Sequence, residues 1–182
     1  MKTYAGIGSE KTPPEICSLF KDISLGLGKA GYTLRTGRYK GADRAFEDGC
    51  DSVKGLKEVY IPWQGFGGSI SPLVLGKLET KELAYKFTNK YFEPFSEMLG
   101  FTRRKYVISI FEIMGVDLKS PIDFVLAWDD GGIYSGVCNL TIKIASLYKI
   151  PVFNAKDFET ENEARIGLVK FLRERKWYGT YL

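Results

Sequence analysis

The chain opens with a short apolar segment that runs into a glycine turn and then into a helical pattern, an order that few folds accommodate. The apolar segment covers residues 3–8, and its turn is Gly6–Ser9. Beyond it, Leu19, Ile23 and Leu27 recur at helical spacing. Glycines let the backbone approach an anion, and the free N–H groups at a helix start point at it. The opening therefore predicts a buried strand, a tight turn and a helix, with a phosphate-bearing ligand as the first hypothesis.

The same alternation continues along the chain. Further strands are expected at 32–36, 57–61, 122–128 and 150–154, and further helices at 42–50, within 77–114, at 135–147 and at 160–175. Strands that alternate with helices imply right-handed crossovers and a mainly parallel sheet that is covered on both faces. No linker or repeat interrupts the pattern, so the sequence predicts an α/β protein with a single Rossmann-like three-layer domain over residues 1–182.

Composition excludes several kinds of chemistry. The chain has no histidine, which rules out a Ser-His-Asp triad and a zinc site that contains histidine. Cys17, Cys50 and Cys138 are far apart and odd in number, which favours buried thiols in a reducing compartment. No run approaches the roughly 20 apolar residues of a membrane span. We expect a cytoplasmic protein with no membrane partner, metal or cofactor.

The first candidate contact with a ligand is the opening turn itself. In parallel sheets, ligands bind beyond the carboxyl ends of the strands. Gly8 and Ser9 stand at such an end and offer backbone N–H groups and a hydroxyl. The alternative interpretation is a tight strand-to-helix turn with no ligand, since two glycines alone are weak evidence.

The second candidate is the segment after the second expected strand, Arg35–Asp43, which is rich in glycine and cations. Its Gly37–Gly41 spacing resembles a phosphate loop, but the Gly-Lys-Ser/Thr of a P-loop NTPase is missing. Arg35, Thr36 and Gly37 are predicted ligand contacts, with the arginine supplying charge. The net charge of +4 also suits an anionic ligand. The alternative is a solvated basic turn.

Two acids at the next helix start are the candidate catalytic residues. Asp43 and Glu47 lie four residues apart, on one side of the expected helix. A carboxylate pair there orients a ribose diol or activates water. The alternative is a helix cap and a first-turn acid, both favoured by the helix dipole.

The third candidate segment follows the fourth expected strand. Trp128 ends that strand and is a candidate to border a base, while Ser135 and Gly136 precede a helix and are candidates to hold phosphate. A core aromatic at a strand end is the alternative for Trp128. For Cys138, in the same helix start, we expect a small buried residue rather than a reactive thiol.

Several motifs occur together: Tyr4–Ser9 with Thr12-Pro13, Leu34–Gly37 with Gly41–Asp43 and Ala45–Glu47, Tyr60–Trp63 with Gly65-Phe66, Gly115–Leu118, Asp123–Val125, and Ile150–Asn154. In combination they resemble phage and bacterial members of the SLOG superfamily. That Rossmann-like group contains the LOG ("Lonely Guy") phosphoribohydrolases and the DprA-type DNA-processing proteins. The resemblance reaches about residue 155 and implies nucleotide binding and a homodimer.

The chain departs from the pattern of that group in places that bear on catalysis. Ser135–Cys138 stands where relatives usually carry Gly-Gly-Thr-Gly. The following stretch, Asn139–Lys143, lacks the catalytic glutamate of LOG enzymes, and Ile108-Ser109 stands where phage relatives have Arg-Asn. These changes affect the LOG reaction more than they affect nucleotide binding.

Three functions compete on these grounds. The favoured one is a binder that senses or sequesters a nucleotide or a nucleotide-derived molecule, plausible for a phage product that acts against host signalling in the host cytoplasm. The alternative is a LOG-like N-glycosidic hydrolase of a nucleoside monophosphate or an ADP-ribose-type ligand. The third, DprA-like binding of single-stranded DNA, is disfavoured because the charge is small and no basic and aromatic stretch is evident.

Overall fold

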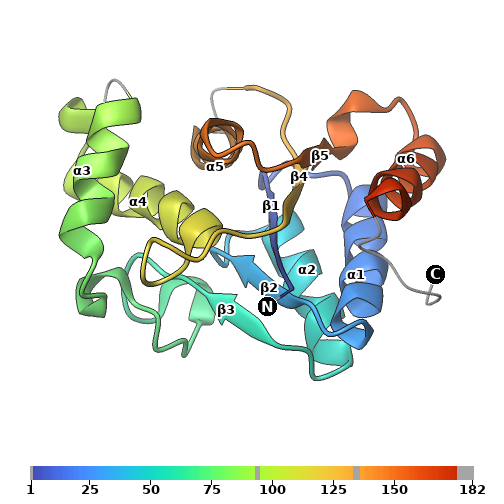
Figure 1. Ribbon diagram of the computed structural model, residues 1–182, viewed down its shortest axis with the longest axis horizontal. Coiled ribbons are helices and arrows are strands. Elements are labelled where there is room, and N and C mark those ends of the chain that lie inside the picture. The colour runs from blue at the N-terminus through green and yellow to red at the C-terminus, as the bar shows by residue number, and fades with distance from the viewer. Residues whose placement is uncertain (1, 93–94, 133–135, 176–182) are drawn as a thin grey trace.

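The computed structural model describes residues 2–92, 95–132 and 136–175 (Figure 1). Within them lie five strands: β1 (Thr3–Gly8), β2 (Thr33–Thr36), β3 (Lys57–Val59), β4 (Phe124–Trp128) and β5 (Val152–Asn154). The same residues hold six α-helices: α1 (Pro14–Lys29), α2 (Ala42–Ser52), α3 (Lys81–Tyr91), α4 (Gly100–Met114), α5 (Gly136–Leu147) and α6 (Glu161–Glu174). The expected alternation of strands and helices is confirmed.

All five strands are parallel and lie in the order β3-β2-β1-β4-β5. Ala5 is the register partner of Arg35 on one side and of Val125 on the other, so β1 is the central strand. The chain adds β2 and β3 on one side of β1, and then returns to add β4 and β5 on the other side. The point between β1 and β4 where this reversal occurs is where open parallel sheets leave a crevice for ligands.

Helices cover both faces of the sheet, which makes three layers. In Figure 1, α1, α2 and α6 lie on one side and α4 and α5 on the other, with α3 packed outside α4. Side chains alternate accordingly: Tyr4 and Phe124 pack toward α1, whereas Ala5, Ile7 and Val125 pack toward α4 and α5. Burial on both faces explains the nearly continuous apolar runs of the strands.

Helix boundaries follow local signals in the sequence. The α6 helix begins with a capping box, in which the Thr160 hydroxyl accepts from the Glu163 amide and the Glu163 carboxylate accepts in return. The α4 helix ends at Met114 and is followed by Gly115, whose φ of 73° glycine adopts with little strain. The third strand is shorter than expected: β3 ends at Val59, and Ile61 bridges to Val74 instead of continuing the sheet.

Candidate functional site

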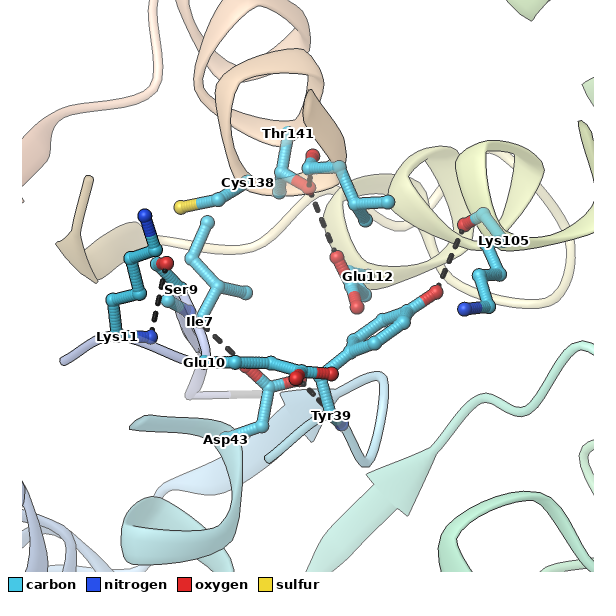
Figure 2. A pocket seen from close by; sticks show the side chains of 12 residues that line it. Ile7, Ser9, Glu10, Lys11, Tyr39, Asp43, Lys105, Glu112, Cys138 and Thr141 are labelled. Atoms are coloured by element: carbon cyan, nitrogen blue, oxygen red, sulfur yellow. Dashed lines mark hydrogen bonds between the residues drawn. The ribbon is translucent and has the colours of Figure 1, made fainter. Parts of the chain in front are cut away.

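A cavity of about 310 Å³ lies at the carboxyl end of β1, at the reversal point of the sheet (Figure 2). Its volume is at the lower end of the range of about 300–1,000 Å³ for small-molecule pockets. The turn after β1, the loop before α2, and the facing sides of α4 and α5 form its walls. The lining residues are Ile7, Gly8, Ser9, Glu10, Lys11, Tyr39, Asp43, Lys105, Glu112, Val137, Cys138 and Thr141.

The turn after β1 is held by its neighbours on both sides. The Ser9 amide donates to the Trp128 carbonyl at 3.2 Å, which ties this turn to the end of β4. Gly41, with φ of 78°, precedes α2, and a Cβ there would lie 2.5 Å from the Ser9 carbonyl oxygen. A Cβ on Gly8 would lie 2.5 Å from that of Ala42. The two glycines therefore allow the start of α2 to press against the turn and close one side of the cavity.

Asp43 forms the floor of the cavity and is almost completely buried. One of its carboxylate oxygens accepts from the Gly8 amide at 3.0 Å, and the other accepts from the amides of Gly37 and Tyr39, both at 3.2 Å. Burial raises the pKa of Asp43, and the amide hydrogen bonds oppose that rise. This single side chain joins the ends of β1 and β2 to the start of α2.

Glu112 brings a second buried carboxyl group to the same cavity from α4. It is 1% exposed, and the Thr141 hydroxyl lies 3.1 Å from its Oε2. Its Oε1 has no hydrogen-bond partner within the described part of the chain. Burial raises the pKa of Glu112 well above the ordinary glutamate value, and the neighbouring Asp43 carboxylate adds to the rise.

The Glu112 carboxyl group was not among the predicted site residues. It stands inside the apolar run Val107–Met114, where helical periodicity alone suggests a core position. That run was itself the available signal, because an acid is almost never fully buried unless it is paired or functional.

Tyr39 and two lysines complete the walls. The Tyr39 hydroxyl donates to the Lys105 carbonyl at 3.1 Å. The rings of Tyr39 and Phe66 pack edge to face, with their centroids 5.2 Å apart. The Lys105 ammonium lies 5.8 Å from the centre of the Phe66 ring. Figure 2 shows Lys11 and Lys105 on opposite sides of the cavity, so positive charge flanks the two acids. Neither lysine was predicted as a site residue, nor was Tyr39.

Other predicted contacts lie outside this cavity. Arg35 is buried within β2, where its Nε bonds Glu58 at 2.8 Å and its Nη1 bonds the Ser120 carbonyl at 2.6 Å. The charge of Arg35 is thus paired with Glu58 within the protein. Thr36 is fully buried, and Gly37 approaches the site through its amide and through the space beside Glu112.

The structure also separates the predicted acid pair. Glu47 is fully buried, but it pairs with Arg38 and with Lys57, the latter at 3.3 Å, and it does not line the cavity. A spacing of four residues on a helix sets the direction of the side chains only approximately, and the partners of Glu47 come from the loop before α2 and from the first residue of β3. The buried carboxyl group that shares the cavity with Asp43 is Glu112, which is 69 positions further along the chain, and the exposed Glu10 also lines it.

The third candidate segment is only partly described. Ser135 lies outside the described residues, and Gly136 begins α5 close to the Tyr106 hydroxyl. The Trp128 side chain packs in the core on the α1 side of the sheet, as its alternative interpretation predicted. Cys138 lines the cavity but is buried, and burial raises the pKa of its thiol, so the expectation of a small buried residue is supported.

Among the described residues, no three cysteine, aspartate or glutamate side chains are grouped so that they could hold a metal ion. No helix in the described ranges has the length and apolar character needed to cross a bilayer. No protein-family model matches the chain, and comparison with curated proteins gives no significant match.

Proposed function

We propose that this protein binds a nucleotide or a nucleotide-derived small molecule in the cavity at the end of β1. The observation that carries the proposal is the position of the cavity: it lies at the reversal point of an all-parallel sheet, and the Gly8-Ser9 turn lines it. Nucleotides bind at this place in open α/β sheets because strand ends, loops and helix starts converge there.

The distribution of charge supports a ligand with two chemically different ends. Lys11 and Lys105 flank the cavity and suit a phosphate, together with the Ser9 hydroxyl. Asp43 and Glu112 lie deep in it and suit hydroxyl or N–H groups. A nucleotide offers both kinds of group in one molecule.

The resemblance to the SLOG superfamily extends this proposal to biology. A phage or bacterial member that binds a signalling nucleotide without cleaving it acts as a sensor or as a sequestering protein, and in a phage it would act against host defence in the host cytoplasm. The resemblance also favours a homodimer. Size-exclusion chromatography with light scattering tests the homodimer directly.

A second candidate, N-glycosidic hydrolysis, is favoured by the two buried carboxyl groups. An acid with a raised pKa protonates a leaving base near neutral pH, while an ionised neighbour stabilises the positive charge that develops on the sugar. Glu112 and Asp43 are candidates for these respective roles. The pair differs from the predicted Asp43 and Glu47.

One experiment distinguishes the two candidates. The protein is incubated with nucleoside monophosphates, NAD and ADP-ribose, and the products are separated by chromatography while binding is followed by calorimetry. Retention of an intact ligand supports the binder. Release of free base that disappears in Glu112→Gln supports the hydrolase, and failure to bind any of these molecules overturns both.

A third candidate, binding of single-stranded DNA, gains one observation that the sequence did not offer. A separate groove of about 670 Å³ brings Trp63 and Tyr85 beside Lys81, Arg103 and Arg104. Aromatic rings beside cations suit stacked bases and phosphates. A mobility shift on oligonucleotides that weakens as salt rises would support this candidate, and the absence of any shift removes it.

A further inference from the structure

We infer that Glu112 recognises the deep end of the ligand, and that this end carries an N–H or O–H donor rather than a phosphate. The inference rests on the proposed function and deepens it, because it assigns an orientation to the nucleotide and names a residue that selects it. The phosphate would then lie toward Lys11 and Lys105.

The geometry of Glu112 carries the inference. The Glu112 side chain lines the cavity, and its Oε1 is buried and has no hydrogen-bond partner among the described residues. A buried carboxyl oxygen without a partner is costly in a folded protein, so each such atom calls for an explanation. Gly37 leaves the space for this oxygen, since a Cβ there would lie 2.5 Å from it. A donor supplied by the ligand satisfies the oxygen.

The hydrogen bonds around Thr141 are compatible with a protonated Glu112. The Thr141 hydroxyl lies 3.1 Å from Glu112 Oε2 and 3.0 Å from the Val137 carbonyl oxygen, but it has a single proton to donate. The Val137 carbonyl can only accept. If Thr141 donates its proton to the Val137 carbonyl, the hydrogen bond between Thr141 and Glu112 requires a proton on Glu112 Oε2.

The surroundings of Glu112 favour that proton as well. Asp43 faces it from α2, Tyr39 from the preceding loop and Cys138 from α5, and none of these groups supplies a positive charge. No cation in the described ranges forms an ion pair with Glu112. Protonated Glu112 donates through Oε2 and leaves Oε1 as an acceptor for the ligand.

The same surroundings disfavour a phosphate at this end of the cavity. A phosphate carries negative charge and only accepts hydrogen bonds from its partners, whereas Asp43 and Glu112 Oε1 present acceptors. The amides that might otherwise hold an anion, those of Gly8 and Gly37, already donate to Asp43. A base amine, a ring N–H or a sugar hydroxyl meets the requirement.

Two variants of one position test the inference. Glu112→Gln keeps an acceptor oxygen and replaces the acid O–H by an amide N–H, whereas Glu112→Met keeps the approximate volume and removes both. Calorimetric titration with 5′-AMP, GMP, CMP and UMP measures affinity at pH 6.5. For the tightest of the four, we expect Glu112→Gln to bind within about twofold of the parent and Glu112→Met to bind about 10- to 100-fold more weakly.

Analogues of the tightest probe locate the donor. One lacks the exocyclic amine of the base where there is one, and two lack the 2′- or the 3′-hydroxyl. The analogue that binds weakly to the parent protein, but as well as its complete counterpart to Glu112→Met, identifies the group that meets Glu112. Thermal melting of each variant confirms that it is folded.

The outcomes separate this inference from the proposed function. If the parent binds none of the four nucleotides, the proposed function fails and the inference fails with it. If the parent binds one of them and Glu112→Met binds it equally well, only the inference is overturned. A loss in Glu112→Gln as large as that in Glu112→Met overturns the protonated form of Glu112 from which the inference is argued, because the ligand would then require an ionised carboxylate.

Discussion

Two buried glutamates, Glu47 on α2 and Glu112 on α4, differ in their partners: among the described residues, the first is paired with cations and the second is not. Glu47 is fully buried and one of its oxygens bonds Arg38 and Lys57. Glu112 is equally buried, but its only hydrogen-bond partner among the described residues is the Thr141 hydroxyl. The first carboxylate is paired with two cations, whereas burial and the neighbouring Asp43 carboxylate raise the pKa of the second.

This difference indicates which buried acid is available to a ligand. An acid that is paired with cations holds two segments together, and its negative charge is already neutralised within the protein. An acid that faces a cavity without a cation can take a partner from a molecule that enters the cavity. The Oε1 of Glu47 also lacks a hydrogen-bond partner among the described residues, but Glu47 does not line the cavity. Burial alone does not separate the two cases, whereas the identity of the nearest partner does.

The largest effect is expected from Asp43→Ala, which removes the acceptor for three amides. Hydrogen bonds to a charged group contribute about 1.5–3 kcal/mol each, and the buried amides would be left unpaired, so we expect a loss of about 5 kcal/mol in the free energy of unfolding, at the lower end of their sum. Urea denaturation measures it. Asp43→Asn, which keeps one acceptor oxygen, serves as the matched control and should lose less. A loss below about 1 kcal/mol in Asp43→Ala would contradict the view that Asp43 stabilises the fold through its hydrogen bonds to three amides.

The next effect is expected on the other side of the comparison, from Glu47→Ala. Removing one partner of a buried ion pair costs about 3–5 kcal/mol, and we expect the lower end, about 3 kcal/mol, because Arg38 and Lys57 reach water. The measurement is again urea denaturation. Glu112→Ala should cost less than Glu47→Ala at pH 8.5, and the reverse order would break the comparison.

A pH series sharpens the comparison further. The pKa of Glu112 rises from 4.5 to about 8 on folding, so between these values the unfolded chain releases a proton that the folded protein keeps. Stability should therefore fall as pH rises through this window, and Asp43 contributes in the same direction. In Glu112→Gln the fall should be shallower. Melting temperatures from pH 4.5 to 9 measure it, and parallel curves for the two proteins would show that Glu112 does not hold the proton.

The smallest effects are expected at the lysines of the two regions. Lys57 is committed to Glu47 and Asp51, so Lys57→Met should lower stability by about 1 kcal/mol and leave ligand affinity unchanged. Lys105 forms no ion pair with any described residue, so Lys105→Met should leave stability unchanged and weaken nucleotide binding by about 3- to 10-fold at low salt. Calorimetry at two salt concentrations checks both, and equal effects of the two variants on affinity would refute the distinction.

Most of the fold could be predicted because its signals are local. The apolar run Phe124–Trp128 is buried on both faces, and its neighbours in the chain are a turn and a helix, so a parallel sheet follows. The order of the strands was not predicted, since it depends on which edges meet across the core. The third strand was predicted too long, because Ile61 has strand-like character and yet bridges to a loop residue, Val74.

The site was predicted in part, and the residues show why. Gly8, Ser9 and Asp43 line the cavity, since they follow strand ends that a parallel sheet must bring to one edge. Arg35 has a side chain suited to binding phosphate, but it forms an ion pair with Glu58 on the neighbouring strand. Glu112 comes from a helix that the sequence offers as core, and only packing places it opposite Asp43.

The three amides that share Asp43 as their acceptor belong to two segments, the end of β1 and the loop between β2 and α2. Backbone amides in a turn usually exchange their hydrogens with solvent independently of one another. Here Gly8, Gly37 and Tyr39 can lose protection together, because one movement of one side chain frees all of them. We therefore expect a molecule bound against the Asp43 side chain to slow amide hydrogen exchange at all three positions together.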